Sequence, residues 1–256
     1  MHDPRLDLKE ALTQRRPILG SWLQAGCPAA AEILANAGYA WLGLDCEHTS
    51  AGYAVVEGIA RALHGRGAAL LVRVSQCDTL EIRRCLDIGA AGVIVPLIET
   101  AEQARRAVAA AKYPPLGCRG FCFGRMNDWG VHFDEYARTA NDQTVVIAMI
   151  ESRQGVERID EILAVDGVDG VFIGPYDLSG SYGVPGQVQH EFVRQARDRV
   201  LQACAAAGKA AGQHIVRSIP AQIQAALADG FTFICLDADI ILLDRAARQA
   251  LNWNGK

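Results

Sequence analysis

Two carboxylates come directly after short apolar runs in this chain. Glu151 follows Val-Val-Ile-Ala-Met-Ile, and Asp177 follows Val-Phe-Ile-Gly-Pro-Tyr. If these runs are neighbouring strands, the two carboxylates repel one another unless a cation lies between them, and Mg²⁺ or Mn²⁺ prefers such oxygen ligands. The two positions therefore predict a divalent-metal site that leaves coordination positions open for substrate and water.

A cation and a base occupy comparable positions in the sequence. Arg73 interrupts the apolar run Leu-Leu-Val-Arg-Val, where a charge needs a partner or an anionic ligand. Asp45 and His48 come at the end of another apolar run, and an imidazole can exchange a proton near neutral pH. Two acids, a base and a cation on one rim would make a catalytic site.

Each of these residues also has an interpretation without catalysis. Gln24, His214 and Asp237 end further apolar runs and widen the set of candidates. An acid after a strand often caps the next helix, which applies to Asp45 and Asp237. A lone histidine such as His214 is more often a hydrogen-bonded rim residue, so the prediction of a site depends on several residues converging.

The positions of the lysines argue against Schiff-base chemistry. The chain has four of them, Lys9, Lys112, Lys209 and Lys256, and none follows an apolar run at the place where a catalytic group is expected. A Schiff-base mechanism needs an amine at the reacting carbonyl. If this protein stabilises an enolate, we therefore expect a metal ion to do so.

Short apolar runs alternate with helical patterns along the chain, which is typical of repeated β/α units. The expected strands cover Ile18–Gln24, Trp41–Asp45, Ala69–Val74, Gly92–Leu97, Val145–Ile150, Gly170–Ile173, Ala210–Gln213 and Phe231–Leu236. The expected helices cover Pro28–Ala37, residues 53 to about 66, Thr79–Ile88, Thr100–Ala111, Val156–Ala164, Phe192–Ala207, Pro220–Ala228 and Asp239–Leu251. Eight such units predict an α/β fold, a (β/α)8 TIM barrel whose chemistry sits at the carboxyl ends of its strands.

Residues 113–143 interrupt this repeat with proline, glycine and aromatic residues, and a second irregular stretch ends at Gln189. A loop as long as the first one is usually a lid or a binding loop. No linker-like composition separates two halves, so we expect residues 1–256 to form one domain. A doubly wound open sheet is the alternative, but the turn Gln24–Pro28 lacks the glycine pattern of a dinucleotide site.

Composition narrows the class of partner. The net charge is -4 and no basic stripe is present, which argues against nucleic acid. The first residues lack the apolar stretch of a signal peptide, and no apolar run reaches membrane-spanning length. Eight cysteines without a C-x-x-C pair favour a reduced, cytoplasmic setting over a disulfide framework or a zinc site.

Several blocks of the sequence, in order, resemble the HpcH/HpaI aldolase family of class II pyruvate aldolases, within the phosphoenolpyruvate/pyruvate barrel superfamily. The blocks are Gly-Ser-Trp-Leu from residue 20, Leu-Asp-Cys-Glu-His from 44, Val-Arg-Val from 72, Asp-Ile-Gly-Ala-Ala-Gly-Val-Ile-Val-Pro-Leu from 87, Tyr-Pro-Pro-Leu-Gly-Cys-Arg-Gly from 113, Ile-Glu-Ser-Arg from 150 and Asp-Gly-Val-Asp-Gly-Val-Phe-Ile-Gly-Pro-Tyr-Asp-Leu-Ser from 166. The likeness covers residues 17 to 245, and the last block is highly specific.

The resemblance implies a role for each matched position. Glu151 and Asp177 would bind the metal ion, Arg73 would hold the carboxylate and keto oxygen of pyruvate, and His48, oriented by Asp45, would be the acid/base. The remaining substrate contacts that it implies are Gly174, Pro175, Tyr176, Trp22 and Arg119.

The implied reaction is the reversible cleavage of a 4-hydroxy-2-oxo acid, of the 2-keto-3-deoxy sugar acid or diacid type, to pyruvate and an aldehyde. Mg²⁺, Mn²⁺ or Co²⁺ would stabilise the enolate. The alternatives are oxaloacetate decarboxylation or decarboxylative C–C bond formation, a lyase acting on a coenzyme A thioester, and a non-catalytic keto-acid-binding barrel. Family members form homo-oligomers, hexamers or trimers, and helix 239–251 would pack on a neighbouring subunit.

Three departures from the family pattern leave the aldehyde partner open. Met149 stands where a glutamine is common, and the bulky Tyr176 precedes the aspartate ligand. The block from Phe121 to Gly130 is more aromatic than in sugar-acid aldolases.

Overall fold

Eight parallel strands close into a barrel in the computed structural model, which describes residues 3–251. Met1, His2 and residues 252–256, including Lys256, lie outside the described residues. The strands follow one another around the barrel in chain order, with β8 paired to β1. Their bounds are β1 Ile18–Leu23, β2 Trp41–Asp45, β3 Ala69–Arg73, β4 Gly92–Val95, β5 Val145–Ile150, β6 Gly170–Ile173, β7 Ala210–Ile215 and β8 Phe233–Ala238.

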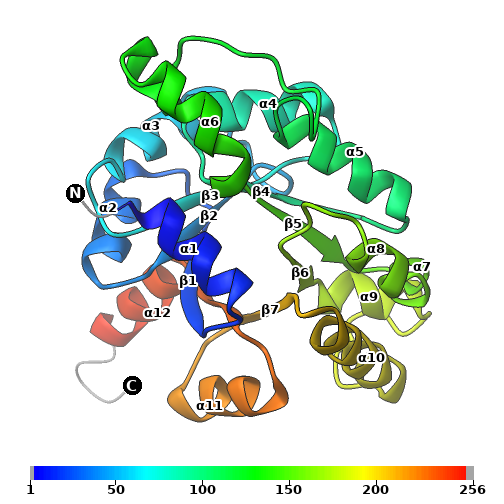
Figure 1. The fold of residues 1–256 in the computed structure, drawn as a ribbon. Helices are drawn as coiled ribbons and strands as arrows, with labels where there is room; N and C mark the ends of the chain where they lie inside the picture. Colours follow the sequence, from blue (N-terminus) through cyan, green and yellow to red (C-terminus); the bar gives the residue numbers. More distant parts are fainter. Residues whose placement is uncertain (1–2, 252–256) are drawn as a thin grey trace.

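Helices surround this barrel (Figure 1). Their bounds are α1 Pro4–Thr13, α2 Pro28–Asn36, α3 Tyr53–Ala62, α4 Thr79–Ile88, α5 Ala101–Ala111, η1 Arg125–Gly130, α6 Phe133–Gln143, α7 Arg153–Glu157, α8 Ile159–Leu163, α9 Pro175–Ser181, α10 Glu191–Ala207, α11 Pro220–Asp229 and α12 Asp239–Leu251. The (β/α)8 architecture expected from the sequence is confirmed, and its strand ends form one rim where catalytic residues can meet.

Large aromatic side chains fill the barrel interior. Trp41 stacks on Phe233 with ring centroids 4.2 Å apart, and Trp22 meets Phe172 edge to face at 5.7 Å. Glycine accommodates these rings: a Cβ at Gly20 would lie 2.2 Å from the Trp41 ring. The interior is therefore a packed core that supports the rim rather than an open channel.

Helix α1 closes the amino-terminal end of the barrel and was not anticipated from the sequence (Figure 1). Leu8, Ala11 and Leu12 are buried against the inner core. The carboxylate of Asp3 accepts a hydrogen bond from the Arg5 backbone N–H at 2.9 Å, and Pro4 begins the helix. These start signals are ordinary ones, but the short helix precedes the repeat and could not be assigned to a β/α unit.

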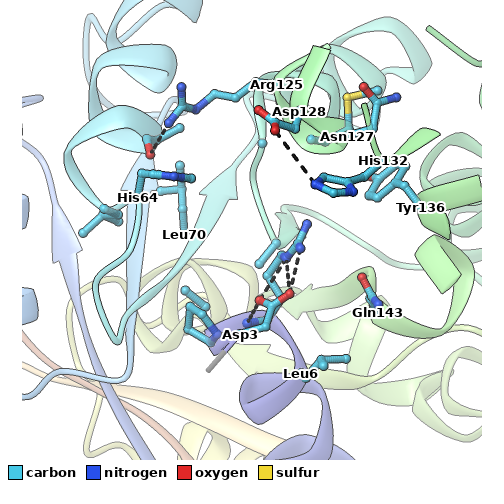
Figure 2. A pocket seen from close by; sticks show the side chains of 18 of the residues that line it. Asp3, Leu6, His64, Leu70, Arg125, Asn127, Asp128, His132, Tyr136 and Gln143 are labelled. Carbon is cyan, nitrogen blue, oxygen red and sulfur yellow. Dashed lines mark hydrogen bonds and ion pairs between the residues drawn. The ribbon is translucent and has the colours of Figure 1, made fainter. Parts of the chain in front are cut away.

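The segment 113–143 differs from the expected lid in two ways. It contains η1 and α6, so it is not a structureless loop. It also joins α5 to β5 and therefore lies at the amino-terminal end of the barrel, opposite the catalytic rim. There it borders a cavity of about 570 Å³ together with residues such as Asp3, His64 and Leu70 (Figure 2). This segment cannot cover the strand ends of its own barrel.

Smaller differences concern element boundaries. The helix expected over Val156–Ala164 is two short helices, α7 and α8, and α9 lies within the second stretch expected to be irregular. The expected capping box of Thr100 and Gln103 at the start of α5 is confirmed. None of the helices within residues 3–251 is both long and apolar enough to cross a membrane.

Candidate active site

The ends of β2 and β3 present a buried ion pair. Asp45 and Arg73 are register partners on these strands. Arg73 donates from Nε to Asp45 Oδ1 at 3.0 Å and from Nη2 to Oδ2 at 2.7 Å. Burial alone would raise the pKa of Asp45, but the hydrogen bond and charge of Arg73 hold it below its usual value. The pair is therefore ionised, and the guanidinium is fixed in one orientation.

Two apolar side chains hold the same guanidinium from inside the barrel. The Arg73 Cζ lies 4.9 Å from the centre of the Trp22 ring, and the Met149 sulfur lies 4.0 Å from Nη1. Trp22 is only 4% exposed. Trp22, expected to contact substrate, thus has a clear role in positioning Arg73.

Glu151, directly after β5, is buried beside further carboxylates. Its Oε1 accepts a hydrogen bond from the Leu97 backbone N–H at 2.8 Å. Burial raises the pKa of Glu151 to about 7, against the hydrogen bond from Leu97, and the charges of Glu47 and Asp177 raise it further. Negative charge at this position is therefore only partly compensated by the protein.

Gly174 leaves the space beside Glu151 open. A Cβ at Gly174 would lie 2.6 Å from Glu151 Oε2, so any side chain there would displace the carboxylate. Pro175 begins α9, and Asp177 lies exposed in its first turn. Strands β5 and β6 are neighbours, which brings Glu151 and Asp177 to adjacent positions on the rim.

The donor set fits a hard divalent cation. Glu151 and Asp177 offer carboxylate oxygens, and the charge of Asp177 raises the pKa of Glu151, while Arg73 is already paired with Asp45. Among residues 3–251 there is no group of three or more His, Cys, Asp or Glu side chains placed to hold a metal ion. The protein would therefore supply two ligands and leave the remaining positions to substrate and water.

Glu47 belongs to this site and was not anticipated from the sequence. Its Oε2 lies 3.3 Å from Arg73 Nη1 and 3.6 Å from His48 Nε2, and has no hydrogen-bond partner among the described residues. Burial raises its pKa, opposed by Arg73 and His48. Its place between Asp45 and His48 in the block Leu-Asp-Cys-Glu-His was the available signal.

His48 reaches the rim but has a different neighbour from the one expected. Its side chain is 60% exposed and lies beside Glu47. Asp45 Oδ1 accepts hydrogen bonds from the backbone N–H groups of Glu47 and His48, at 3.1 and 3.2 Å, and not from the imidazole. Asp45 therefore shapes the loop that carries His48, and Glu47 is the carboxylate next to its ring.

Tyr176 and Arg119 have contrasting positions. Tyr176 is 60% exposed on the rim next to Asp177. Arg119 lies at the opposite end of the barrel, where Nη2 donates to Asp87 at 2.8 Å and Cζ lies 4.6 Å from the centre of the Tyr113 ring. Because the segment carrying Arg119 follows α5 rather than a strand, the structure does not bring this expected substrate contact to the site of its own chain.

The described lysines all lie away from the rim. Lys9 pairs with Asp169 at 2.5 Å, Lys112 donates to the Thr144 carbonyl at 2.7 Å, and Lys209 donates to the Val168 carbonyl at 2.7 Å. Each is engaged at the amino-terminal end of the barrel. None of these three amines can reach a carbonyl bound near Glu151.

The remaining strand-end candidates are a glutamine, a histidine and an aspartate. Gln24 Nε2 donates to Asp45 Oδ2 at 3.2 Å and so supports the ion pair. Asp237 Oδ2 accepts from the Ser218 hydroxyl at 2.7 Å and lies 3.4 Å from Arg245, which ties β8 to the loop between β7 and α11 and to α12. His214 lies on β7, next to β8, and its Nε2 is 2.8 Å from the Asp237 carbonyl oxygen.

Comparisons with known proteins identify the family of the chain. Residues 19–246 match the model of the HpcH/HpaI aldolase/citrate lyase family. The chain is 38% identical to the hydroxypyruvate/pyruvate aldolase of Roseobacter denitrificans, over 99% of both chains. It is also 38% identical to the 4-hydroxy-2-oxo-heptane-1,7-dioate aldolase of Salmonella typhimurium, over 93% of this chain and 90% of the relative.

A solved structure gives the same result. The crystal structure of an HpcH/HpaI aldolase/citrate lyase family protein from Burkholderia cenocepacia superposes with a TM-score of 0.91 at 37% identity, covering 96% of this chain and 98% of the other. Sequence and fold lead to one conclusion: the chain belongs to the HpcH/HpaI aldolase/citrate lyase family.

Proposed function

We propose that this protein is a metal-dependent aldolase that reversibly cleaves a 4-hydroxy-2-oxo acid to pyruvate and an aldehyde. The observation that carries the proposal is the buried Glu151 beside the exposed Asp177, on a rim that has a fixed guanidinium and no lysine from residues 3–251. The relatives named as hydroxypyruvate/pyruvate and 4-hydroxy-2-oxo-heptane-1,7-dioate aldolases support a 2-oxo acid as the nucleophilic half.

Glu151 and Asp177 would hold Mg²⁺, Mn²⁺ or Co²⁺. When bound, such a cation supplies Lewis-acid stabilisation of the negative charge that develops on the keto oxygen. The open space at Gly174 and the first turn of α9, with Pro175 and Tyr176, would border the substrate carboxylate.

Arg73 contributes a second, permanent positive charge. Asp45, Trp22 and Met149 hold its guanidinium before substrate arrives. A charge fixed in this way stabilises a developing oxyanion without the cost of reorganisation. We therefore assign Arg73 to the carboxylate and keto oxygen of the 2-oxo acid.

His48 is the group placed to move a proton. In cleavage it takes the proton from the C4 hydroxyl, the C3–C4 bond breaks, and its electron pair passes to the 2-oxo acid half while C4 becomes the aldehyde carbon. In synthesis His48 returns that proton to the new alkoxide. Glu47, 3.6 Å from Nε2, stabilises the imidazolium formed in between.

Helix α12 supports association of several copies. Ile240 is 45% exposed, Leu243 is 70% exposed and Leu251 is 77% exposed, all on this last helix. Apolar side chains in such numbers on one helix are typical of an interface. We propose a homo-oligomer, and sedimentation velocity of the unmodified protein against an α12 variant such as Leu243→Asp tests it.

A panel assay tests the reaction. Pyruvate is incubated with glyoxylate, succinic semialdehyde, tartronate semialdehyde or free sugars, with and without divalent metal, and the products are separated by chromatography. We expect a 4-hydroxy-2-oxo acid from at least one aldehyde, formed only with metal. The absence of aldol product with every aldehyde, while oxaloacetate is decarboxylated in a parallel incubation, would contradict the proposal.

A further inference from the structure

His214 lies in the ring of inward-facing side chains that contains Glu151 and Gly174. Gly212, two residues earlier on β7, faces inward, since a Cβ there would lie 2.7 Å from Phe172 and 2.6 Å from Phe233. Side chains alternate along a strand, so His214 faces the interior one layer nearer the rim. Phe172 pairs with Gly212, and this register places His214 level with Gly174.

The interior location agrees with the electrostatics. Burial lowers the pKa of His214, opposed by its hydrogen bond to the Asp237 backbone, and the charge of Arg73 lowers it further. An imidazole that points into the barrel is consistent with this contribution from Arg73, which lies on β3. The lowered pKa favours the neutral form of the ring.

One ring nitrogen of His214 already makes a hydrogen bond, and this determines whether the other nitrogen donates or accepts. Nε2 lies 2.8 Å from the Asp237 carbonyl oxygen, and a carbonyl oxygen only accepts, so Nε2 carries the proton. In a neutral imidazole Nδ1 then has a lone pair. No residue within the described part of the chain donates a hydrogen bond to Nδ1.

A glycine separates His214 from Glu151 on the rim. The β5–β6 and β6–β7 registers place Gly174 between the two residues, and a Cβ at Gly174 would lie 2.6 Å from Glu151 Oε2. No side chain of residue 174 therefore stands between His214 and a group bound at Glu151.

We infer that His214 Nδ1 accepts a hydrogen bond from a hydroxyl group on C3 of the 2-oxo acid, so that hydroxypyruvate is preferred over pyruvate as the nucleophile. His214 lies level with Gly174, which borders the space assigned to the 2-oxo acid. The side chain of His48, the group assigned to the hydroxyl on C4, is 60% exposed. A deep acceptor therefore meets the 2-oxo acid and its C3 substituent. This inference rests on the proposed aldolase function and specifies its substrate.

The test measures kcat/KM for hydroxypyruvate and for pyruvate with the same aldehyde and metal. The variants are His214→Leu, which removes both nitrogens, His214→Asn, which places an acceptor near Nδ1, and His214→Gln, which keeps a donor near Nε2. His64→Leu, at the opposite end of the barrel, is the matched control. Thermal unfolding and circular dichroism establish that each variant is folded.

We expect His214→Leu to lower the ratio of the two kcat/KM values, hydroxypyruvate over pyruvate, by about fivefold, since a neutral hydrogen bond contributes about 1 kcal/mol. His214→Asn should restore part of the ratio, and His64→Leu should not change it. Rescue by His214→Gln but not by His214→Asn would show a structural role through Asp237 and overturn the inference.

Two further results separate this inference from the function on which it rests. An unmodified protein that uses pyruvate but not hydroxypyruvate, or a ratio unchanged in His214→Leu, would overturn the inference alone. An unmodified protein that forms no aldol product with either nucleophile would overturn the proposed function itself.

Discussion

The carboxylate of Asp45 accepts two hydrogen bonds from the guanidinium of Arg73, of 3.0 and 2.7 Å, at the ends of two adjacent strands. The Arg73 side chain is 10% exposed and the Asp45 side chain is not exposed at all. This pair gives the rim a cation whose position does not depend on substrate. It also links the catalytic rim to the stability of the barrel.

Removing Asp45 should therefore affect both activity and stability. We expect Asp45→Ala to lower the free energy of unfolding by about 3 kcal/mol, because a buried charge loses its partner. The loss of orientation of Arg73 should lower kcat/KM by about 100-fold. Urea unfolding and steady-state kinetics measure the two effects. The control is Glu32→Ala, which breaks the half-exposed pair with Arg66 and should cost less than about 1 kcal/mol.

His48→Ala should separate proton transfer from metal binding. We expect the rate of C–C cleavage to fall by about 10²–10⁴-fold, the usual contribution of a general acid/base. Binding of Mn²⁺, followed by electron paramagnetic resonance, should be unchanged because His48 is not an assigned ligand. His64→Ala supplies the control, and an equal loss in both variants would argue against a catalytic role for His48.

Asp177→Ala should abolish metal binding. Glu151 alone would remain as a ligand, and one carboxylate does not retain a hydrated divalent cation at micromolar concentration. Isothermal titration calorimetry with Mn²⁺ measures the effect. Asp166→Ala, which removes an exposed carboxylate before β6, should bind metal normally. Undiminished affinity in Asp177→Ala would remove Asp177 from the site.

The site was predictable where the chemistry follows an apolar strand. Arg73 and Glu151 stand out because a charge there interrupts or ends a buried run, and the barrel register does bring them to one rim. Glu47 was missed because it lies within a loop, where an acidic residue is unremarkable. Its burial and its distance to Arg73 depend on tertiary packing that no local pattern shows.

The fold was predictable for the same reason, and the prediction failed outside the β/α repeat. The β/α alternation determined the eight strands, whereas α1 and the segment 113–143 obey no such period. The position of Arg119 follows from connectivity: a segment between a helix and the next strand lies at the amino-terminal end of the barrel. Applying that rule to the sequence would have excluded Arg119 from the rim of its own chain.

Lys112 should make stability depend on pH in the alkaline range. Burial, and then the nearby charge of Lys9, lowers the pKa of Lys112 from 10.5 to about 8. Between these values the unfolded chain binds more protons than the folded chain, so the free energy of unfolding should rise with pH. The destabilisation caused by burying the charged Lys112 is fully present below pH 8 and disappears above the pKa of Lys112 in the unfolded chain.

Comparison with Lys112→Met isolates this contribution. Between pH 7.5 and 9.5 the unfolding free energy of the unmodified protein should rise by about 2 kcal/mol more than that of the variant. Urea unfolding at the two pH values measures the difference. A difference that stays constant, or that reverses in sign, would contradict the assignment.

We propose that a cation held by Glu151 and Asp177, and not an amine, activates the 2-oxo acid. The decisive measurement is the exchange of the C3 protons of pyruvate for deuterium, followed by nuclear magnetic resonance. We expect exchange by the metal-loaded protein, its loss after EDTA treatment, and its recovery with Mg²⁺, Mn²⁺ or Co²⁺. Exchange that survives chelation, or borohydride trapping of pyruvate on a lysine, would contradict the account.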